Sequence, residues 1–268
     1  MNRREFAIAG SALAAAGVPV SVFAGPSPTL LAAVNGPQRS AKNKARDPWR
    51  HPAESLAFWG LAPGMTVVEI DPSGGYWTEI LAPYLKATGG RYIAALDGDP
   101  TTFKTRFSDV SIWGPIEIAA FDDGAGALAA PGSADFLLTA RNIHDWMWTP
   151  GELSKALASF HAALKPRGIL AVEEHRADPR PMVADAKDGY VSTAFLTKAV
   201  EAAGFALKAS SEINANPKDT KDYPFGVWTL PPTLRTHAKD QPTPASFDAA
   251  KYPPIGESDR MTLRFAKV

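Results

Sequence analysis

Residues 67–85 read VVEIDPSGGYWTEILAPYL, and they are the most informative segment for predicting the fold. A short apolar run ends at Glu69-Ile70, a turn of small residues follows, and a helical pattern begins near Trp77. An apolar run of this length between chain breakers is typical of a strand buried on both faces of a parallel sheet. A strand, a tight turn and a helix in this order predict the first half of a βαβ unit.

The same alternation continues along the chain and predicts the fold class. We expect strands at 65–70, 92–96, 116–120, 136–139, 169–172, 205–213 and 260–267, and helices at 52–61, 77–86, 152–164 and 191–203. This order predicts an α/β fold, Rossmann-like and doubly wound, with a mostly parallel sheet. A connection as long as 214–258 is uncommon inside a domain, and we interpret it either as a lid over a site or as a strap along the sheet edge.

The N-terminal sequence predicts a targeting segment followed by a linker. Asn2-Arg3-Arg4-Glu5-Phe6 precedes an Ala- and Gly-rich apolar stretch, a pattern typical of a twin-arginine signal peptide. The stretch is short and contains Pro19, which disfavours an uncleaved membrane anchor. We therefore expect a cleaved signal at 1–24, a linker with at most one short helix at 25–50, and one domain at 51–268 with its core at 51–213. The partner of the signal is the twin-arginine export machinery, and the expected location is the periplasm.

Composition excludes several kinds of chemistry. Lys plus Arg equals Asp plus Glu at 28 each, so the chain lacks the overall basic charge that attracts nucleic acid. Cysteine is absent, which excludes a thiolate nucleophile, a disulfide framework and a thiolate zinc site. Chemistry must come from carboxylates, His, Tyr, Ser, Lys or a bound cofactor.

The turn after the first strand favours a ligand that carries positive charge. Glu69 and Asp71 stand at the strand end, and an acidic pair attracts a cation. Ser73, Gly74 and Gly75 would let a ligand approach the backbone. The turn lacks the G-x-G-x-x-G pattern, so a nicotinamide dinucleotide is disfavoured. A Gly-Gly pair taken alone after a strand is weak evidence for a site and is more typical of an ordinary turn.

Acidic residues also follow the second and third strands. In GGRYIAALDGDP, residues 89–100, Asp97 comes about 20 residues after the glycine turn, where it can accept hydrogen bonds from ribose hydroxyls. Asp99 reads better as an exposed turn carboxylate. Phe121-Asp122 follows the third strand, where a ring and an acceptor can meet an adenine. These groups at successive strand ends predict a nucleoside site.

At this point the chain resembles the class I S-adenosylmethionine (SAM)-dependent methyltransferases, over roughly residues 50–210. The resemblance rests on two segments, ADFLLTARNIHDWMW at 134–148 and LKPRGILAVEEHR at 164–176. They match the fourth strand and the Leu-Lys-Pro-x-Gly turn of that superfamily. RNIHDW, AVEAAGFAL, INANPKD and ESDRMTLRFAK resemble a bacterial group of predicted methyltransferases of unknown substrate.

The resemblance implies a specific sheet and a specific cofactor pocket. The sheet would have seven strands, with the last one, 260–267, inserted antiparallel. SAM would bind at residues 69–75, with its ribose on Asp97 and its adenine near Asp122. The superfamily turn usually reads acidic-x-Gly-x-Gly-x-Gly, whereas Asp71 and Ser73 replace two of these glycines here.

The segment RNIHDWMW begins where the fourth strand ends, beside the expected position of the methyl group. His144 is the candidate general base because its ordinary pKa lies near neutrality, and Asp145 is the alternative catalytic residue. Asn142 is expected to hold the amino-acid part of SAM or the acceptor. Trp146 and Trp148 are expected to form an aromatic wall. The competing interpretation is that a single His among aromatic residues has a structural role.

Two functions follow from these observations. Glu173-Glu174-His175 offers a carboxylate–histidine pair, but its spacing matches no metal motif, and no metal is predicted. The first hypothesis is a SAM-dependent methyltransferase that acts on a small-molecule acceptor. The second is an exported, non-catalytic binding protein that keeps the fold, because its glycine turn is altered.

Overall fold

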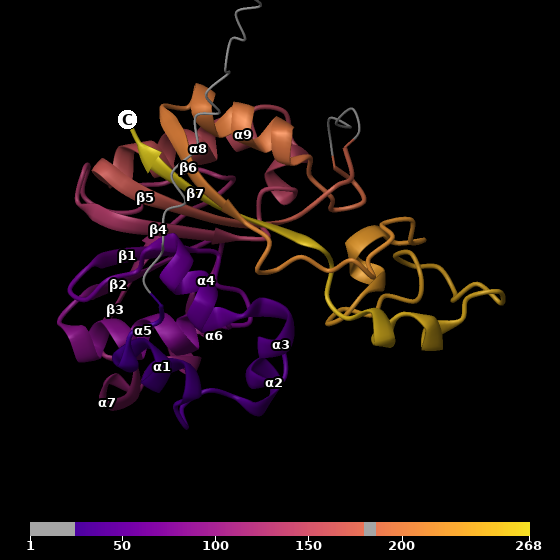
Figure 1. The fold of residues 1–268 in the computed structure, drawn as a ribbon, viewed down its shortest axis with the longest axis horizontal. Coiled ribbons are helices and arrows are strands. Elements are labelled where there is room, and N and C mark those ends of the chain that lie inside the picture. Colours follow the sequence, from indigo (N-terminus) through magenta and orange to yellow (C-terminus); the bar gives the residue numbers. More distant parts are fainter. Residues whose placement is uncertain (1–24, 180–185) are drawn as a thin grey trace, which may run out of the picture.

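The structure is a computed structural model that describes residues 25–179 and 186–268. Its centre is a seven-stranded sheet with the strand order β3-β2-β1-β4-β5-β7-β6 (Figure 1). The strands are β1 (Thr66–Ile70), β2 (Arg91–Leu96), β3 (Ile116–Ala120), β4 (Ala134–Ala140), β5 (Leu164–His175), β6 (Phe205–Ser211) and β7 (Arg260–Lys267). The signal peptide expected at 1–24 lies outside the described residues.

Strand pairing confirms the predicted topology. β1 lies between β2 and β4 and is parallel to both. β7 lies between β5 and β6 and is antiparallel to both, as the resemblance implied. β2 and β3 are added on one side of β1, whereas β4 and the later strands lie on its other side. The carboxyl ends of β1 and β4 therefore border the crevice where ligands bind in doubly wound sheets.

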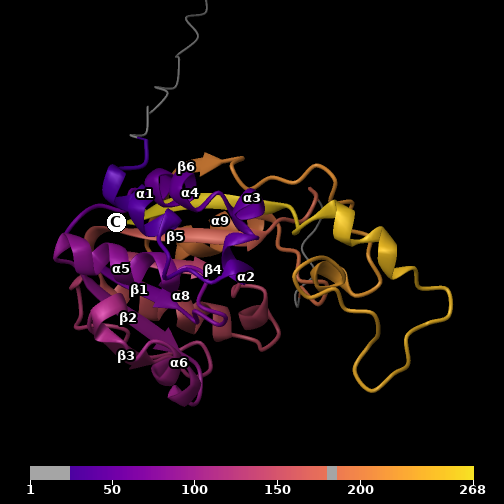
Figure 2. The ribbon, with the colours of Figure 1, turned by 90° about the horizontal axis from the view of Figure 1, so that it is seen from below.

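Helices cover both faces of the sheet (Figure 1, Figure 2). They are α4 (Pro52–Trp59), α5 (Thr78–Thr88), α6 (Thr101–Arg106) and α7 (Val110–Trp113) on one face, and α8 (Glu152–Ala163) and α9 (Thr193–Ala202) on the other. Strand side chains alternate between the two layers. Val68 and Ile70 of β1 pack in the α8–α9 layer, whereas Val67 packs in the α5 layer. This alternation also turns Glu69 toward α5, where it contacts Thr78.

The segment 25–50 differs from the expected linker. It forms α1 (Pro28–Asn35), α2 (Ala41–Lys44) and α3 (Asp47–Arg50). Leu30, Ala33 and Val34 are buried in the α5 layer. Arg39 and Arg50 are buried as well. Apolar periodicity could not reveal this segment, because its helices are short and part of what they bury is guanidinium.

Segment 214–258 is tied to the core at its ends and extends to one side of the sheet (Figure 1, Figure 2). Its regular structure consists of the 3₁₀ helices η2 (Gly226–Thr229), η3 (Ala249–Lys251) and η4 (Pro253–Ile255). Asn214 Nδ2 donates to Thr262 Oγ1 at 2.9 Å, which ties the segment to β7. The rings of Phe225 and Tyr252 pack on either side of Phe247, with centroids 5.8 and 5.1 Å away.

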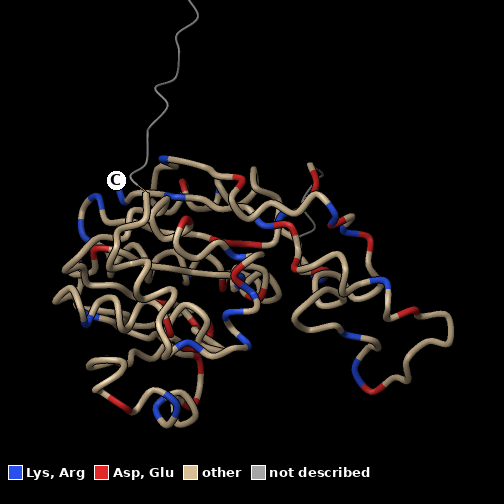
Figure 3. The backbone as a smooth tube through the Cα atoms, turned by 60° about the horizontal axis from the view of Figure 1, so that its bottom comes forward, with Lys and Arg blue, Asp and Glu red and all other residues tan. Residues whose placement is uncertain are grey.

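Charged residues of both signs are interspersed along the trace (Figure 3). Within residues 25–179 and 186–268, no helix combines the length and the apolar character that a membrane crossing requires.

Candidate functional site

A cavity of about 420 Å³ lies at the carboxyl ends of β1 and β4. Its volume is within the range of small-molecule sites, about 300–1,000 Å³. Of the predicted site residues, it is lined by Glu69, Asp71, Ser73, Gly74, Asn142, His144 and Asp145, and it does not reach Gly75, Asp97 and Asp122. Segment 214–258 contributes Val227, Trp228 and residues 231–233 to the wall.

The loop after β1 has the backbone that glycine usually provides. Asp71, Ser73 and Gly75 have φ values of 45°, 49° and 68°. Left-handed backbone costs an ordinary L-residue about 1–2 kcal/mol, so the surroundings must hold Asp71 and Ser73 there. The Asp71 N–H donates to Ala95 O at 2.8 Å. Apart from its chain neighbours, no described residue lies within 4 Å of the point where a Cβ would stand on Gly74, so a ligand can approach this backbone closely.

Glu69 is occupied by contacts inside the fold. Its side chain is buried, and Oε2 accepts hydrogen bonds from the hydroxyls of Thr78, at 3.0 Å, and Tyr92. Burial raises the pKa of Glu69 to about 7, although the two hydroxyls oppose this shift. Glu69, which was predicted to attract a cationic ligand, is therefore engaged in hydrogen bonds that support the loop after β1.

Acidic side chains gather at one end of the cavity. Partial burial raises the pKa of Asp71, and the negative charges of Asp97 and Asp145 raise it further. Asp97 is exposed at the end of β2, and no described residue donates a hydrogen bond to its carboxylate. Asp122 accepts the Gly98 N–H at 3.1 Å, so it already has a structural contact. Both carboxylates predicted to meet a nucleoside are exposed, and Asp97 is the one without such a structural contact.

Two aromatic expectations differ from the structure. Phe121 packs in the core, with its ring 5.6 Å from Trp146 and 5.8 Å from Phe160, so it cannot reach an adenine. Trp146 belongs to the same core cluster and forms no part of the cavity wall. Both side chains turn into the α8 layer. Trp228 lines the cavity instead, with its ring 5.7 Å from that of His144.

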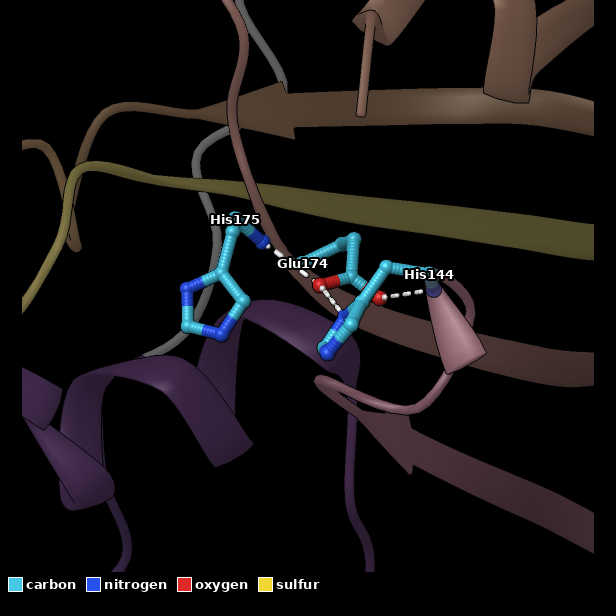
Figure 4. A group of neighbouring side chains, drawn as sticks. All are labelled: His144, Glu174 and His175. Atoms are coloured by element: carbon cyan, nitrogen blue, oxygen red, sulfur yellow. Dashed lines mark hydrogen bonds and ion pairs between the residues drawn. The ribbon is translucent and has the colours of Figure 1, made fainter. Parts of the chain in front are cut away.

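His144 is held in one orientation by Glu174. Its Nδ1 lies 3.0 Å from Glu174 Oε1 (Figure 4). A carboxylate only accepts hydrogen bonds, so Nδ1 carries the proton and Nε2 is the basic atom. Nε2 lies 3.4 Å from Asp145 Oδ1, beside the cavity. Burial lowers the pKa of His144, but the charge and hydrogen bond of Glu174, together with Asp145, outweigh burial and raise it.

The backbone fixes Glu174 in turn. Its Oε2 accepts the N–H groups of Ile143, at 2.8 Å, and His144, at 3.3 Å, and its Oε1 accepts that of His175 at 2.8 Å. The possible ligand atoms of His144, Glu174 and His175 lie within 4.8 Å of one another, a grouping that a metal could bridge. The carboxylate already accepts four hydrogen bonds, which favours its role as the group that orients His144. The sequence suggested a pair within Glu173-Glu174-His175, whereas the structure pairs Glu174 with His144.

His175 has a different environment from His144. Its Nδ1 lies 2.5 Å from Ser258 Oγ. Burial lowers its pKa well below the ordinary value, and the positive charges of His144 and Arg141 lower it further. His175 is therefore neutral at physiological pH.

Another part of the cavity wall carries four cationic side chains beside the carboxylate of Glu257, and the sequence did not predict this cationic wall. It consists of Lys42, Arg46 and Arg50 from the α2–α3 segment and Arg141 after β4. The first three lie in the stretch assigned to a linker. Arg141 stands beside His144 in RNIHDW, but no sequence signal gave it a role.

Comparisons with known proteins identify the fold. No family model and no curated protein sequence matches the chain. A SAM-dependent methyltransferase from Aquifex aeolicus has a TM-score of 0.55 and 14% identity, over 84% of this chain and 93% of its own. The 1,6-didemethyltoxoflavin-N1-methyltransferase of Burkholderia thailandensis has a TM-score of 0.51 and 16% identity, over 83% of this chain and 79% of its own. The [4+2]-cyclase SpnF has a TM-score of 0.58 and 14% identity, over 89% of this chain and 92% of its own.

The chain therefore has the Rossmann-like fold of SAM-dependent methyltransferases. At these identities the likeness concerns the fold alone. A cyclase stands among the similar structures, so the fold does not determine the reaction, and function has to be argued from the site.

Proposed function

We propose that this protein is a SAM-dependent methyltransferase that acts on a small-molecule acceptor. The proposal rests on the position of His144. Glu174 orients this side chain at the wall of the cavity, and the left-handed loop after β1 lines the same cavity. The open backbone at Gly74 and the cavity volume fit a nucleoside cofactor. Asp97 would accept the ribose hydroxyls, and Asn142, fixed by donation to Ile70 O at 2.9 Å, would border the amino-acid part.

When bound, SAM supplies an electrophilic methyl group on a positively charged sulfur. The chain contributes position, charge and proton removal. Asp71 and Asp145 favour a cation at their end of the cavity. Nε2 of His144 would accept the proton that an O–H or N–H of the acceptor loses when that group takes the methyl from the sulfur, which leaves as S-adenosylhomocysteine. Glu174 and Asp145 stabilise the imidazolium that forms.

A second candidate function is the binding of a ligand without catalysis. The observation in its favour is the β1 loop, where Asp71 and Ser73 hold left-handed conformations that glycine would adopt without strain. In this account the cavity is retained, and its ligand differs from SAM.

Native mass spectrometry of the purified protein separates the two functions. A mass increase that matches SAM or S-adenosylhomocysteine supports the methyltransferase. A different bound ligand, together with no uptake of SAM at millimolar concentration, supports the binding protein.

We further propose that the protein is exported to the periplasm by the twin-arginine route. The support is the Arg3-Arg4 signal, which lies outside the described residues. This route carries folded proteins, so it suits a domain that acquires its cofactor in the cytoplasm. Replacing both residues by Lys should keep a folded protein in the cytoplasm. Unchanged periplasmic accumulation would contradict the export proposal.

A further inference from the structure

The cationic wall carries more positive charge than its neighbours neutralise. At this end of the cavity, four guanidinium groups meet two carboxylates: Arg46, Arg50, Arg141 and Arg260, with Glu173 and Glu257. The cluster is mostly buried, so water screens these charges poorly. Within the described residues, it therefore retains an excess of positive charge.

The contacts of Glu257 show why this excess persists. Its Oε1 lies 2.6 Å from Arg46 Nε, and its Oε2 lies 2.8 Å from Arg50 Nε and 2.9 Å from Arg260 Nη1. Burial alone would raise the pKa of Glu257, but these three cations hold it well below its ordinary value. One carboxylate thus serves three guanidinium groups, and its contact with Arg50 is through Nε, which leaves Nη1 and Nη2 of Arg50 without a partner among the described residues.

Three guanidinium groups on the cavity wall, those of Arg46, Arg50 and Arg141, have donors without a partner among the described residues. Arg50 is fully buried, and its Nη1 and Nη2 have no hydrogen-bond partner among the described residues. Arg141 has a left-handed backbone with φ of 65°, and its Nε is buried without a hydrogen-bond partner among the described residues. Buried donors without partners are rare in folded proteins and call for a ligand or water. Burial, together with the charge of Arg141, lowers the pKa of Arg50, as expected for a cation that lacks a full counterion.

We propose that Arg50 and Arg141 bind an oxyanion, a carboxylate or a phosphate, on the methyl acceptor. The inference rests on the proposed function and specifies its substrate class. Guanidinium presents paired donors that match both kinds of oxyanion. The acceptor is accordingly a small molecule with at least one acidic group, bound so that its nucleophilic atom reaches His144.

The charge pattern assigns this anion to the acceptor rather than to the cofactor. Asp71 and Asp97 follow β1 and β2, whereas Arg141 follows β4 and the partners Glu173 and Arg260 lie on β5 and β7. The acidic side chains after β1 and β2 are therefore separated along the sheet edge from the guanidinium groups at β4 to β7, whereas Asp145, which also follows β4, interacts electrostatically with Arg141. The methionine end of SAM carries an ammonium beside its carboxylate, so it would not neutralise an excess of positive charge.

Isothermal titration of inorganic phosphate and of succinate into the purified chain, without cofactor, tests the site. We expect saturable binding of at least one probe, weakened at least tenfold in Arg141→Gln, because one charge-assisted contact is lost. The Nε of Arg141 has no partner among the described residues for this variant to lose, so the fold should persist, and a thermal melt checks this. Arg91→Gln removes the same charge from an exposed pair with Glu117 and should bind as the wild type does. Arg50→Gln should also weaken binding.

No saturable binding, or equal affinity in the wild-type and Arg141→Gln chains, overturns the site. Titrations that combine the anion with S-adenosylhomocysteine identify the source of the anion. Simultaneous binding supports the acceptor, whereas mutual exclusion assigns the anion to the cofactor and overturns the proposal. If the anion binds and S-adenosylhomocysteine does not, the proposed methyltransferase function fails while the anion site stands.

Discussion

Two buried glutamates at the strand ends serve different purposes because their partners differ. Glu69 accepts hydrogen bonds from two hydroxyl groups beneath the β1 loop. Glu174 accepts three backbone N–H groups and the imidazole of His144. The first therefore supports a loop, and the second orients a base. Each role predicts its own dependence on pH.

Replacing Glu174 by Gln keeps the shape of the side chain and removes its charge. We expect the pKa of His144 to fall, because Glu174 is the main group that raises it. NMR titration of the imidazole measures this shift directly. A base works in its deprotonated form, so the acid limb of the pH–rate profile should move to lower pH as well.

The exposed Glu117→Gln should leave this titration unchanged, whereas an unshifted pKa in Glu174→Gln would contradict the orienting role. The raised pKa of His144 also determines how this residue makes the free energy of unfolding depend on pH. The folded state binds the proton of His144 more tightly than the unfolded state does. His144 therefore contributes stability below its unfolded pKa, and this contribution is lost as pH rises through its folded pKa.

Glu69→Gln should change how the free energy of unfolding depends on pH. The pKa of Glu69 rises from 4.5 to about 7 on folding, so the folded state favours the protonated carboxyl. The wild type then loses stability as pH rises through this interval, and the variant does not. In urea unfolding, the free energy of unfolding of the variant relative to that of the wild type should increase by about 3 kcal/mol between pH 4 and pH 8. A difference that stays constant over this range would contradict the buried, protonatable state of Glu69.

At the scale of elements, predictability followed the length and apolar regularity of each segment. The strands and the helices α4, α5, α8 and α9 were predictable, because each repeats an apolar pattern that its layer buries. The helices α2 and α3 were not, because they span four residues each, and α1 was expected only as one short helix within a linker. The signal for α1 was local: Ser27 accepts the Leu30 N–H at 3.2 Å, with Pro28 as the first helical residue.

Two adjacent leucines test whether α1 belongs to the domain. Leu30 is 2% exposed and Leu31 is 41% exposed. Leu30→Ala should lower the free energy of unfolding by about 2–4 kcal/mol, because it opens a cavity against α5. Leu31→Ala should change it by less than about 0.5 kcal/mol. If urea unfolding shows that both substitutions change the free energy of unfolding by the same small amount, α1 would be part of a linker and not of the domain.

At the scale of the molecule, the topology made one half of the site predictable. Parallel strands bring their carboxyl ends to a single edge, so Asp71, Asp97 and His144 could be placed together from their positions after strands. The pairing of Glu174 with His144 could not, because adjacent strand ends allow several partners. Arg50 and Trp228 could not either, because they come from α3 and segment 214–258, whose paths over the edge depend on tertiary packing.

Titration calorimetry with S-adenosylhomocysteine measures whether this edge of the sheet binds SAM, as we claim. We expect saturable binding, one ligand per chain. Asp97→Ala should weaken it by about 1–3 kcal/mol, because the ribose hydroxyls lose a charged acceptor. Asp99→Ala should leave it unchanged, because the Asp99 carboxylate accepts the Thr101 N–H at 2.9 Å at the start of α6. Equal affinities in the wild-type and Asp97→Ala chains would remove Asp97 from the site. No binding heat and no thermal shift at millimolar ligand would contradict the claim itself.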